Sequence, residues 1–152
     1  MIVYRISNAG YSDDISGTGA KINGSRWNSK GVAVLYTSQF ISLAVLEMLV
    51  NTNFKDYAIA LDLMYINFPD EQTTTIIDSK NLKTNWRDDF EYTRYIGDEF
   101  FMQKKSLILK VPSAVIQEEH NYLVNPLHVD FKKIKLVKTK SFWPDERLFT
   151  IQ

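Results

Sequence analysis

The stretch GSRWNSKGVAVLYTSQFISLAVLEMLV, residues 24–50, predicts a loop, a strand and a helix in direct succession. Its first eight residues, GSRWNSKG, combine glycines with short polar residues and are typical of a loop. Residues 32–37 form a run of apolar, β-branched and aromatic residues of the strand type. From Ile41 to Val50, apolar side chains fall on nearly every side of a helix that Ser38 would cap, so we expect this helix to be buried.

The rest of the chain adds strands on both sides of this unit and a second helix. Residues 11–30 contain several glycines and are expected to be mainly loop. Residues 88–104 begin with polar side chains and end in two lysines, whose charge suits the negative end of a helix dipole, so they predict a helix. The sum is an α+β fold, rich in strands with helices inserted between them; further strands are expected at residues 2–6, 57–64, 107–111, 122–124 and 131–137.

Length and composition limit the class of protein. No linker rich in Pro, Gly or Ser and no internal repeat divides the 152 residues, so we expect one domain over residues 1–152. The formal net charge of zero argues against a protein that mainly grips nucleic-acid backbones. Because the chain has no cysteine, disulfides, cysteine-ligated zinc and a thiol nucleophile are excluded, which suits a reducing cytoplasm.

The sequence also lacks the patterns of export and membrane insertion. The N-terminal residues MIVYRISNAG do not have the basic-then-apolar order of a signal peptide. The longest apolar run, near residues 40–50, is too short to span a bilayer and contains Glu47. We therefore expect a soluble cytoplasmic protein without a direct nucleic-acid or membrane partner.

Four residues of the opening stretch carry chemistry, and each also has an ordinary interpretation. Glu47 either lies on a solvated stripe of the helix or is held in a cleft, since a carboxylate is rarely buried without a partner. Arg26 either forms a surface ion pair or, beside flexible glycines, reaches a phosphate. Trp27 and Tyr36 are either core side chains or stacking surfaces. Taken singly, none of the four indicates a function.

A series of motifs along the chain changes this interpretation: YRI at residues 4–6, GTGA at 17–20, GSRWN at 24–28, LYTS at 35–38, LAVLE at 43–47, LKVPSAVI at 109–116, NYLVNPLH at 121–128 and DERL at 145–148. With these motifs the sequence resembles the RES-domain toxins, a family named for Arg, Glu and Ser positions. The resemblance covers nearly the whole chain, and residues 67–102 match least. Ser25 stands where the family usually has Gly, and Val129 where it usually has Pro; neither change removes a chemical group.

The resemblance implies a fold similar to the ADP-ribosyltransferases of the diphtheria-toxin type and an enzyme that consumes NAD+. NAD+ would be the substrate, and neither a separate cofactor nor a metal is expected. The family further implies a cognate antitoxin with a helix-turn-helix DNA-binding region, which blocks the active site. The sequence leaves open whether the protein also forms a homo-oligomer.

Within this resemblance, three residues fit the chemistry of breaking the nicotinamide–ribose bond. That step builds oxocarbenium character on the ribose, as glycoside cleavage does, and Glu47 is the carboxylate that would stabilise it. Tyr36 would offer a stacking face to the cationic nicotinamide ring. Arg26 would clamp the pyrophosphate or the nearby ribose.

The remaining candidates have supporting roles. Ser113 corresponds to the third named position of the family, and we expect it to hydrogen-bond the ribose or to order Glu47. Asn125 lies in the family's NP element and is expected to support substrate binding. Trp27 is the remaining candidate for a substrate-stacking surface. His120 and His128 are left out, because the leaving group needs little proton transfer.

Three functions remain open at this stage. The first is a toxin that hydrolyses or phosphorolyses NAD+, and the second is an ADP-ribosyltransferase that modifies a cellular protein. The third is a binding module that keeps the nucleotide cleft without turnover. The lysine-rich run at residues 131–140 suggests a nucleic-acid strip, but lysines on an exposed edge strand more often prevent aggregation. We therefore interpret this run as an edge strand.

Overall fold

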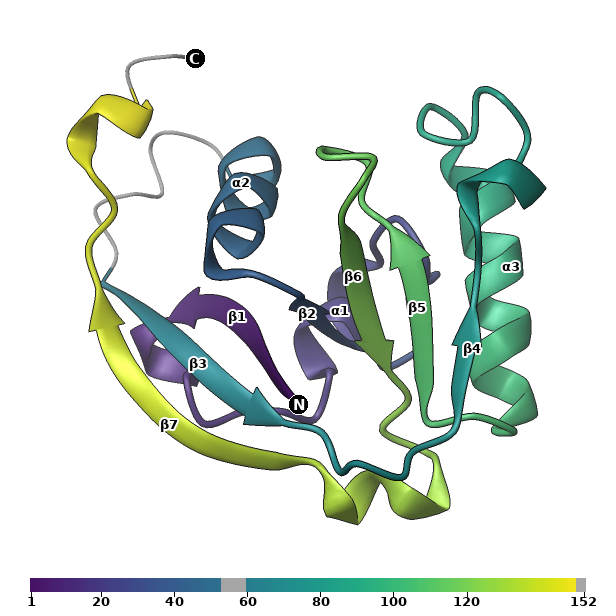
Figure 1. Ribbon diagram of the computed structural model, residues 1–152, viewed down its shortest axis with the longest axis horizontal. Coiled ribbons are helices and arrows are strands. Elements are labelled where there is room, and N and C mark those ends of the chain that lie inside the picture. Colours follow the sequence, from purple (N-terminus) through teal and green to yellow (C-terminus); the bar gives the residue numbers. More distant parts are fainter. Residues whose placement is uncertain (53–59, 150–152) are drawn as a thin grey trace.

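The computed structural model describes residues 1–52 and 60–149. Within them, seven strands form one mixed sheet in the order β4-β5-β6-β2-β1-β3-β7, and only β4 and β5 pair in parallel (Figure 1). The strands are β1 Ile2–Asn8, β2 Leu35–Ser38, β3 Leu61–Asn67, β4 Thr74–Ile76, β5 Ile108–Pro112, β6 His120–Val124 and β7 Lys135–Phe142. The α-helices are α1 Thr18–Asn23, α2 Ile41–Asn51 and α3 Phe90–Gln103.

The sheet bends around its main core. In Figure 1, β3 and β7 run obliquely on one side while β5 and β6 stand upright on the other. One buried cluster nevertheless joins both sides, and the rings of Phe68 and Tyr122 meet edge to face with centroids 6.1 Å apart. The two halves of the sheet therefore share one interior, whose buried members are Val3, Leu35, Met64, Ile66, Phe68, Leu107, Ile108, Tyr122, Val124 and Ile134.

A second buried cluster lies under α3. Phe101 of α3 packs there with Leu109 of β5 and Leu123 of β6, together with two tryptophans of the connecting loops, Trp27 and Trp86. The N-terminus of α3 is capped by Asp89, whose side chain accepts a hydrogen bond from the backbone N–H of Tyr92. This arrangement ties the loop around Trp27 to the helix that follows Trp86.

Most expected elements are present, with shifted boundaries. The strand expected at residues 32–37 is shorter and later, as β2, and β4 and the short helix α1 were not predicted. Ser38 does not cap α2: the helix begins at Ile41, so Phe40 occupies the N-cap position, and the Ser38 hydroxyl donates to Oδ1 of Asn121. The expectation that α2 is buried on all sides was also wrong, since Val50 is 62% exposed.

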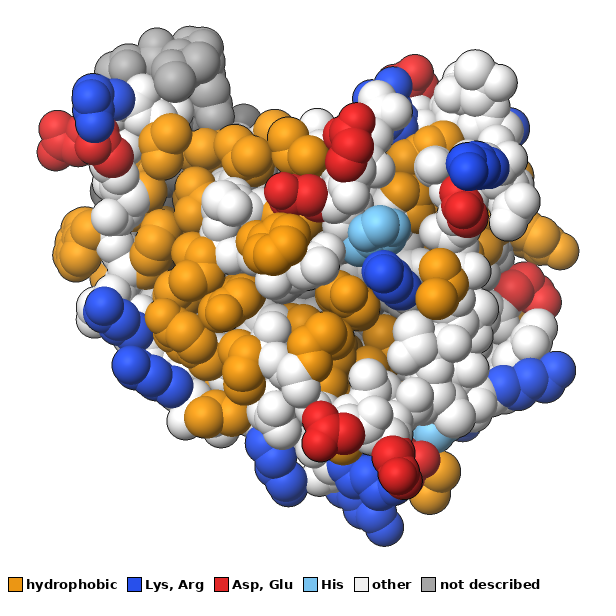
Figure 2. All heavy atoms as spheres, viewed as in Figure 1, with side chains coloured by type: hydrophobic (Ala, Val, Ile, Leu, Met, Phe, Trp, Pro, Cys, Tyr) orange, Lys and Arg blue, Asp and Glu red, His pale blue; other side chains and the backbone are white. Residues whose placement is uncertain are grey.

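The C-terminal strand lies at the edge of the sheet, as its lysines indicate. It begins later than expected, because residues 129–133 form a 3₁₀ helix. In Figure 2, blue side chains follow the lower left margin of the molecule where β7 runs, and Lys135, Lys138 and Lys140 are exposed. The strand expected at residues 57–64 appears as β3; its first three expected residues lie outside the described residues. No helix in the described part of the chain is long and apolar enough to cross a membrane.

Candidate active site

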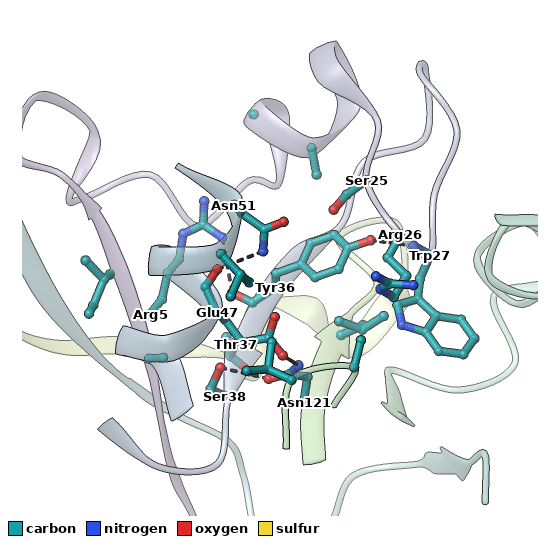
Figure 3. A pocket seen from close by; sticks show the side chains of 18 of the residues that line it. Arg5, Ser25, Arg26, Trp27, Tyr36, Thr37, Ser38, Glu47, Asn51 and Asn121 are labelled. Carbon is teal, nitrogen blue, oxygen red and sulfur yellow. Dashed lines mark hydrogen bonds between the residues drawn. The ribbon is translucent and has the colours of Figure 1, made fainter. Parts of the chain in front are cut away.

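A cleft of about 450 Å³ lies between α2, the middle of β1, the end of β2 and the loop that follows α1 (Figure 3). Gly24 directs this loop toward the cleft: it ends α1 with a φ of 67°, and its N–H bonds the carbonyl of Ala20. Glu47 and Tyr36 occupy the middle of the cleft in Figure 3, with Arg5 to one side and Arg26 to the other. The structure thus brings together Arg26 from the loop, Tyr36 from β2 and Glu47 from α2.

Glu47 is half-buried, and one of its oxygens is fixed. Oε1 accepts hydrogen bonds from Ser113 Oγ at 2.8 Å and from Asn121 Nδ2 at 2.6 Å. Asn121 is oriented in turn by Ser38, whose hydroxyl donates to Asn121 Oδ1 at 2.8 Å. Within the described residues, the second oxygen of Glu47, Oε2, accepts no hydrogen bond. The carboxylate is therefore oriented through one oxygen and retains the other for a ligand.

Ser113 is completely buried and cannot itself line the cleft. Its Oγ accepts hydrogen bonds from the backbone N–H groups of Val115 and Ile116, at 3.0 and 3.1 Å. The single hydroxyl proton is therefore free to point at Glu47. Of the two contacts expected for Ser113, the structure contains the one to Glu47.

Tyr36 is held by its hydroxyl group. The hydroxyl donates to Asn28 Oδ1 at 2.8 Å and accepts from the backbone N–H of Trp27 at 3.1 Å. Burial raises the pKa of the Tyr36 hydroxyl, so the phenol is protonated at neutral pH. The ring lines the cleft and offers a fixed apolar surface beside Glu47.

Arg26 lies at the far end of the cleft with its guanidinium over the ring of Phe90, 4.4 Å from the ring centroid. Its Nη1 donates to the backbone carbonyl of Arg87. Burial lowers the pKa of Arg26, and the negative charge of Glu47 opposes this effect. An arginine remains charged under such conditions. No carboxylate in residues 1–52 or 60–149 forms a salt bridge with Arg26, so its charge is available to an anion.

Sequence reasoning missed two residues of the site, Arg5 and Asn121. Arg5 lines the cleft from β1, donates through Nη1 to the carbonyl of Tyr36 at 3.1 Å, and has a buried Nε without a hydrogen-bond partner in the described structure. Burial lowers the pKa of Arg5, while Asp14 raises it. Both residues lie in motifs quoted above, YRI and NYLVNPLH, and a charged residue in a strand otherwise rich in apolar residues was the available signal for Arg5.

Two expected substrate-binding residues are not placed for that role. Asn125 does not line the cleft: it is fully buried, its Nδ2 donates to the carbonyl of Phe101, and its Oδ1 accepts from the N–H of Leu127. Trp27 is only 2% exposed, and its ring packs against Trp86 with centroids 5.8 Å apart. Trp27 borders the cleft, but its ring belongs to the core. Both residues stabilise the walls of the site.

Comparisons with known proteins decide the family. The RES domain matches residues 2–146 of this chain. The chain belongs to the RES-domain toxin family. It is 38% identical to a protein named Toxin Res from Photorhabdus laumondii, with 97% of each chain covered. It is 36% identical to the Prs ADP-ribosylating toxin of a Sphingobium species, with 90% of this chain and 88% of the relative covered.

A solved structure has the same fold as this chain. The toxin–antitoxin complex MbcT–MbcA of M. tuberculosis contains a chain that superposes with a TM-score of 0.79 and covers 99% of this chain and 87% of that one. The sequence identity is 18%, so the likeness concerns the fold. The α+β fold that the strand and helix patterns predict is thereby confirmed.

Proposed function

We propose that this RES-domain protein is the toxin of a toxin–antitoxin pair and that it degrades NAD+ by cleaving the nicotinamide–ribose bond. The observation that carries the proposal is the arrangement of Glu47, which is fixed through Oε1 in a cleft that an aromatic ring, Tyr36, and two arginines, Arg5 and Arg26, also line. A cationic ring, a ribose and a pyrophosphate are the three parts of NAD+ that such a cleft fits.

Glu47 would act on the ribose. When the bond between C1′ and the nicotinamide nitrogen breaks, its electron pair leaves with the neutral nicotinamide and positive charge develops on the ribose ring. A carboxylate that is already oriented stabilises this charge without reorganising during the reaction. The hydrogen bonds from Ser113 and Asn121 supply that orientation.

Tyr36 and the two arginines would hold the rest of the substrate. The fixed ring of Tyr36 stacks on the cationic nicotinamide, which favours the bound ring before it becomes neutral. Arg26 binds the pyrophosphate, because a guanidinium without a carboxylate partner matches phosphate oxygens with paired donors. Arg5, on the opposite side of Glu47, would contribute a second positive charge to this anionic substrate.

The acceptor of the ADP-ribosyl group distinguishes two forms of this function. Attack by water or inorganic phosphate at C1′ gives ADP-ribose or its phosphate ester, and water releases its proton to solvent. Transfer to a protein side chain is the second candidate, and the Sphingobium relative, named an ADP-ribosylating toxin, favours it. The cleft is the same in both cases, and only the group that enters it differs.

A cognate antitoxin completes the proposal. A solved structure with this fold is a toxin–antitoxin complex, which supports a protein partner for this chain as well. Following the family, we propose that the partner carries a helix-turn-helix region and blocks the cleft, and that both proteins work in the cytoplasm, where NAD+ is available.

Product analysis with the purified protein tests the proposal. NAD+ should disappear with release of nicotinamide, and adding inorganic phosphate should change the second product only if phosphate is the acceptor. Label from NAD+ appearing in a protein band instead would identify the transferase form. In a bacterial host, expression without antitoxin should arrest growth and lower the NAD+ pool. Normal growth with unchanged NAD+ and soluble expression would refute the toxin function.

A further inference from the structure

One side of α3 faces the backbone of the loop that carries Arg26. Thr93, Arg94, Gly97 and Asp98 share this side because residues three and four positions apart lie on the same face of a helix. The loop residues opposite them are separated from α3 by more than 60 positions in the sequence. The contact is therefore a feature of the tertiary structure.

Three side chains of α3 bind three backbone groups of the loop. Thr93 Oγ1 donates to the carbonyl of Arg26 at 2.6 Å, and Arg94 Nε donates to the carbonyl of Ser25 at 2.7 Å. Asp98 Oδ1 accepts from the N–H of Ser29 at 2.9 Å. The backbone on both sides of Arg26 is thus fixed to the helix.

Gly97 allows the two backbones to touch at the centre of this contact. A Cβ atom at Gly97 would lie 1.8 Å from the carbonyl oxygen of Trp27 and 2.8 Å from its carbonyl carbon. No side chain fits there without displacing the loop. The helix and the loop are therefore in direct van der Waals contact at the residue after Arg26.

Of the three side chains of α3, Thr93 is the one that binds the backbone of Arg26 itself. It is completely buried, so its hydroxyl has no access to water. The carbonyls of Asp89 and Phe90 are both 3.3 Å from Oγ1, against 2.6 Å for that of Arg26, so the proton points to Arg26. The guanidinium of Arg26 also lies over the ring of Phe90, the first residue of α3.

We propose that α3 is a platform that positions Arg26 for the pyrophosphate of NAD+, with Thr93 as its central positioning residue. The inference rests on the proposed function for its ligand and adds a role for a segment that the sequence resemblance left without one. The loop itself contains glycines and short polar residues, and the bonds from α3 remove its freedom before the ligand arrives. Such preorganisation appears in binding and in KM rather than in the rate of the chemical step.

A double-mutant cycle between Thr93 and Arg26 tests the platform. Thr93→Val keeps the shape of the side chain and removes the hydroxyl, and Arg26→Lys keeps the charge and removes the paired donors. The dissociation constant for ADP-ribose is measured by calorimetry for the wild type, both single variants and the double variant. KM and kcat for NAD+ are measured alongside.

We expect Thr93→Val to weaken ADP-ribose binding and raise KM by about five- to tenfold with kcat nearly unchanged, the scale of one lost buried hydrogen bond. In the Arg26→Lys background the same substitution should change binding less than about twofold, because coupled sites are not additive. Thr93→Ser should restore the wild-type values. Ile66→Val, in the other core cluster, is the control for a mild loss of stability without change in KM.

If Thr93→Val weakened ADP-ribose binding equally in the wild-type and Arg26→Lys backgrounds, the proposed role of α3 would be wrong. An unchanged KM for NAD+ in the folded Thr93→Val variant would also refute it. A wild-type protein that binds ADP-ribose without consuming NAD+ would refute the cleavage reaction, and the binding cycle would still decide the role of α3. Failure of the wild type to bind ADP-ribose would overturn both.

Discussion

Replacing Ser113 with alanine removes a hydrogen bond that orients Glu47 but keeps the charge of its carboxylate, so it tests the orientation alone. The substitution removes one hydroxyl that never reaches the cleft, because Ser113 is completely buried. Oε1 of Glu47 then keeps only the hydrogen bond from Asn121. We expect kcat for NAD+ cleavage to fall by about ten- to a hundredfold while KM changes little, since a misoriented carboxylate loses transition-state stabilisation more than ground-state binding.

The same substitution has a calculable effect on stability. It leaves the N–H groups of Val115 and Ile116 without their acceptor; each would cost about 1–3 kcal/mol if fully buried, and less here because both residues are half-buried. A total loss of about 2–4 kcal/mol would lower Tm by roughly 5–15 °C in a chain of this size. Thermal melting and NAD+ consumption, both measured below the melting transition, give the two effects separately.

A serine outside the site provides the control. The Ser106 hydroxyl hydrogen-bonds to Thr75 on an exposed part of the sheet, away from the cleft, so Ser106→Ala should leave kcat, KM and Tm close to those of the wild type. Ser113→Ala with kcat within twofold of wild type, at a temperature where it is fully folded, would refute the claim that this hydroxyl orients Glu47.

Two further substitutions test the other side chains of the cleft. Arg26→Ala should lower kcat/KM for NAD+ by about a hundredfold, mainly through KM, while Tm stays near wild type because only exposed and half-buried contacts are lost; a large drop in Tm with proportionate loss of activity would mean that Arg26 is structural. Tyr36→Phe should cost about 1–3 kcal/mol of stability, because the N–H of Trp27 and Oδ1 of Asn28 lose their partner. Its kcat/KM should stay within about fivefold of wild type because the ring remains, and a hundredfold fall in kcat would assign the hydroxyl to the chemistry.

The local part of the site was predictable from sequence. Arg26, Tyr36 and Glu47 lie within one loop–strand–helix unit, where glycines, β-branched residues and apolar periodicity each indicate an element. The apolar pattern of α2 does not show in which direction Glu47 points. Apolar residues lie on an exposed side of this helix as well, so the pattern does not distinguish its buried side from its exposed side. The resemblance to the RES-domain toxins favoured the cleft over the solvated stripe, and the structure places Glu47 in the cleft.

The rest of the site could not be predicted from sequence, because it depends on contacts between residues that are far apart in the chain. Asn121 meets Glu47 across 74 positions, and Thr93 meets Arg26 across 67. No local pattern marks such pairs, since they arise from the order of strands in the sheet and from the packing of α3. Asn125 was misplaced for the same reason: its motif lies just beyond β6, and only the packed structure shows that its amide turns toward Phe101 and away from the cleft.

The turnover of NAD+ by Glu47→Gln is the most direct test of the central claim. The amide keeps the size of the side chain and part of its hydrogen bonding but removes the negative charge that we propose acts on the ribose. We predict that kcat falls on the order of a hundredfold or more while NAD+ binding and Tm stay close to those of the wild type. Turnover within a few-fold of wild type would contradict the account, because Glu47 would then be only a carboxylate on the surface of a helix.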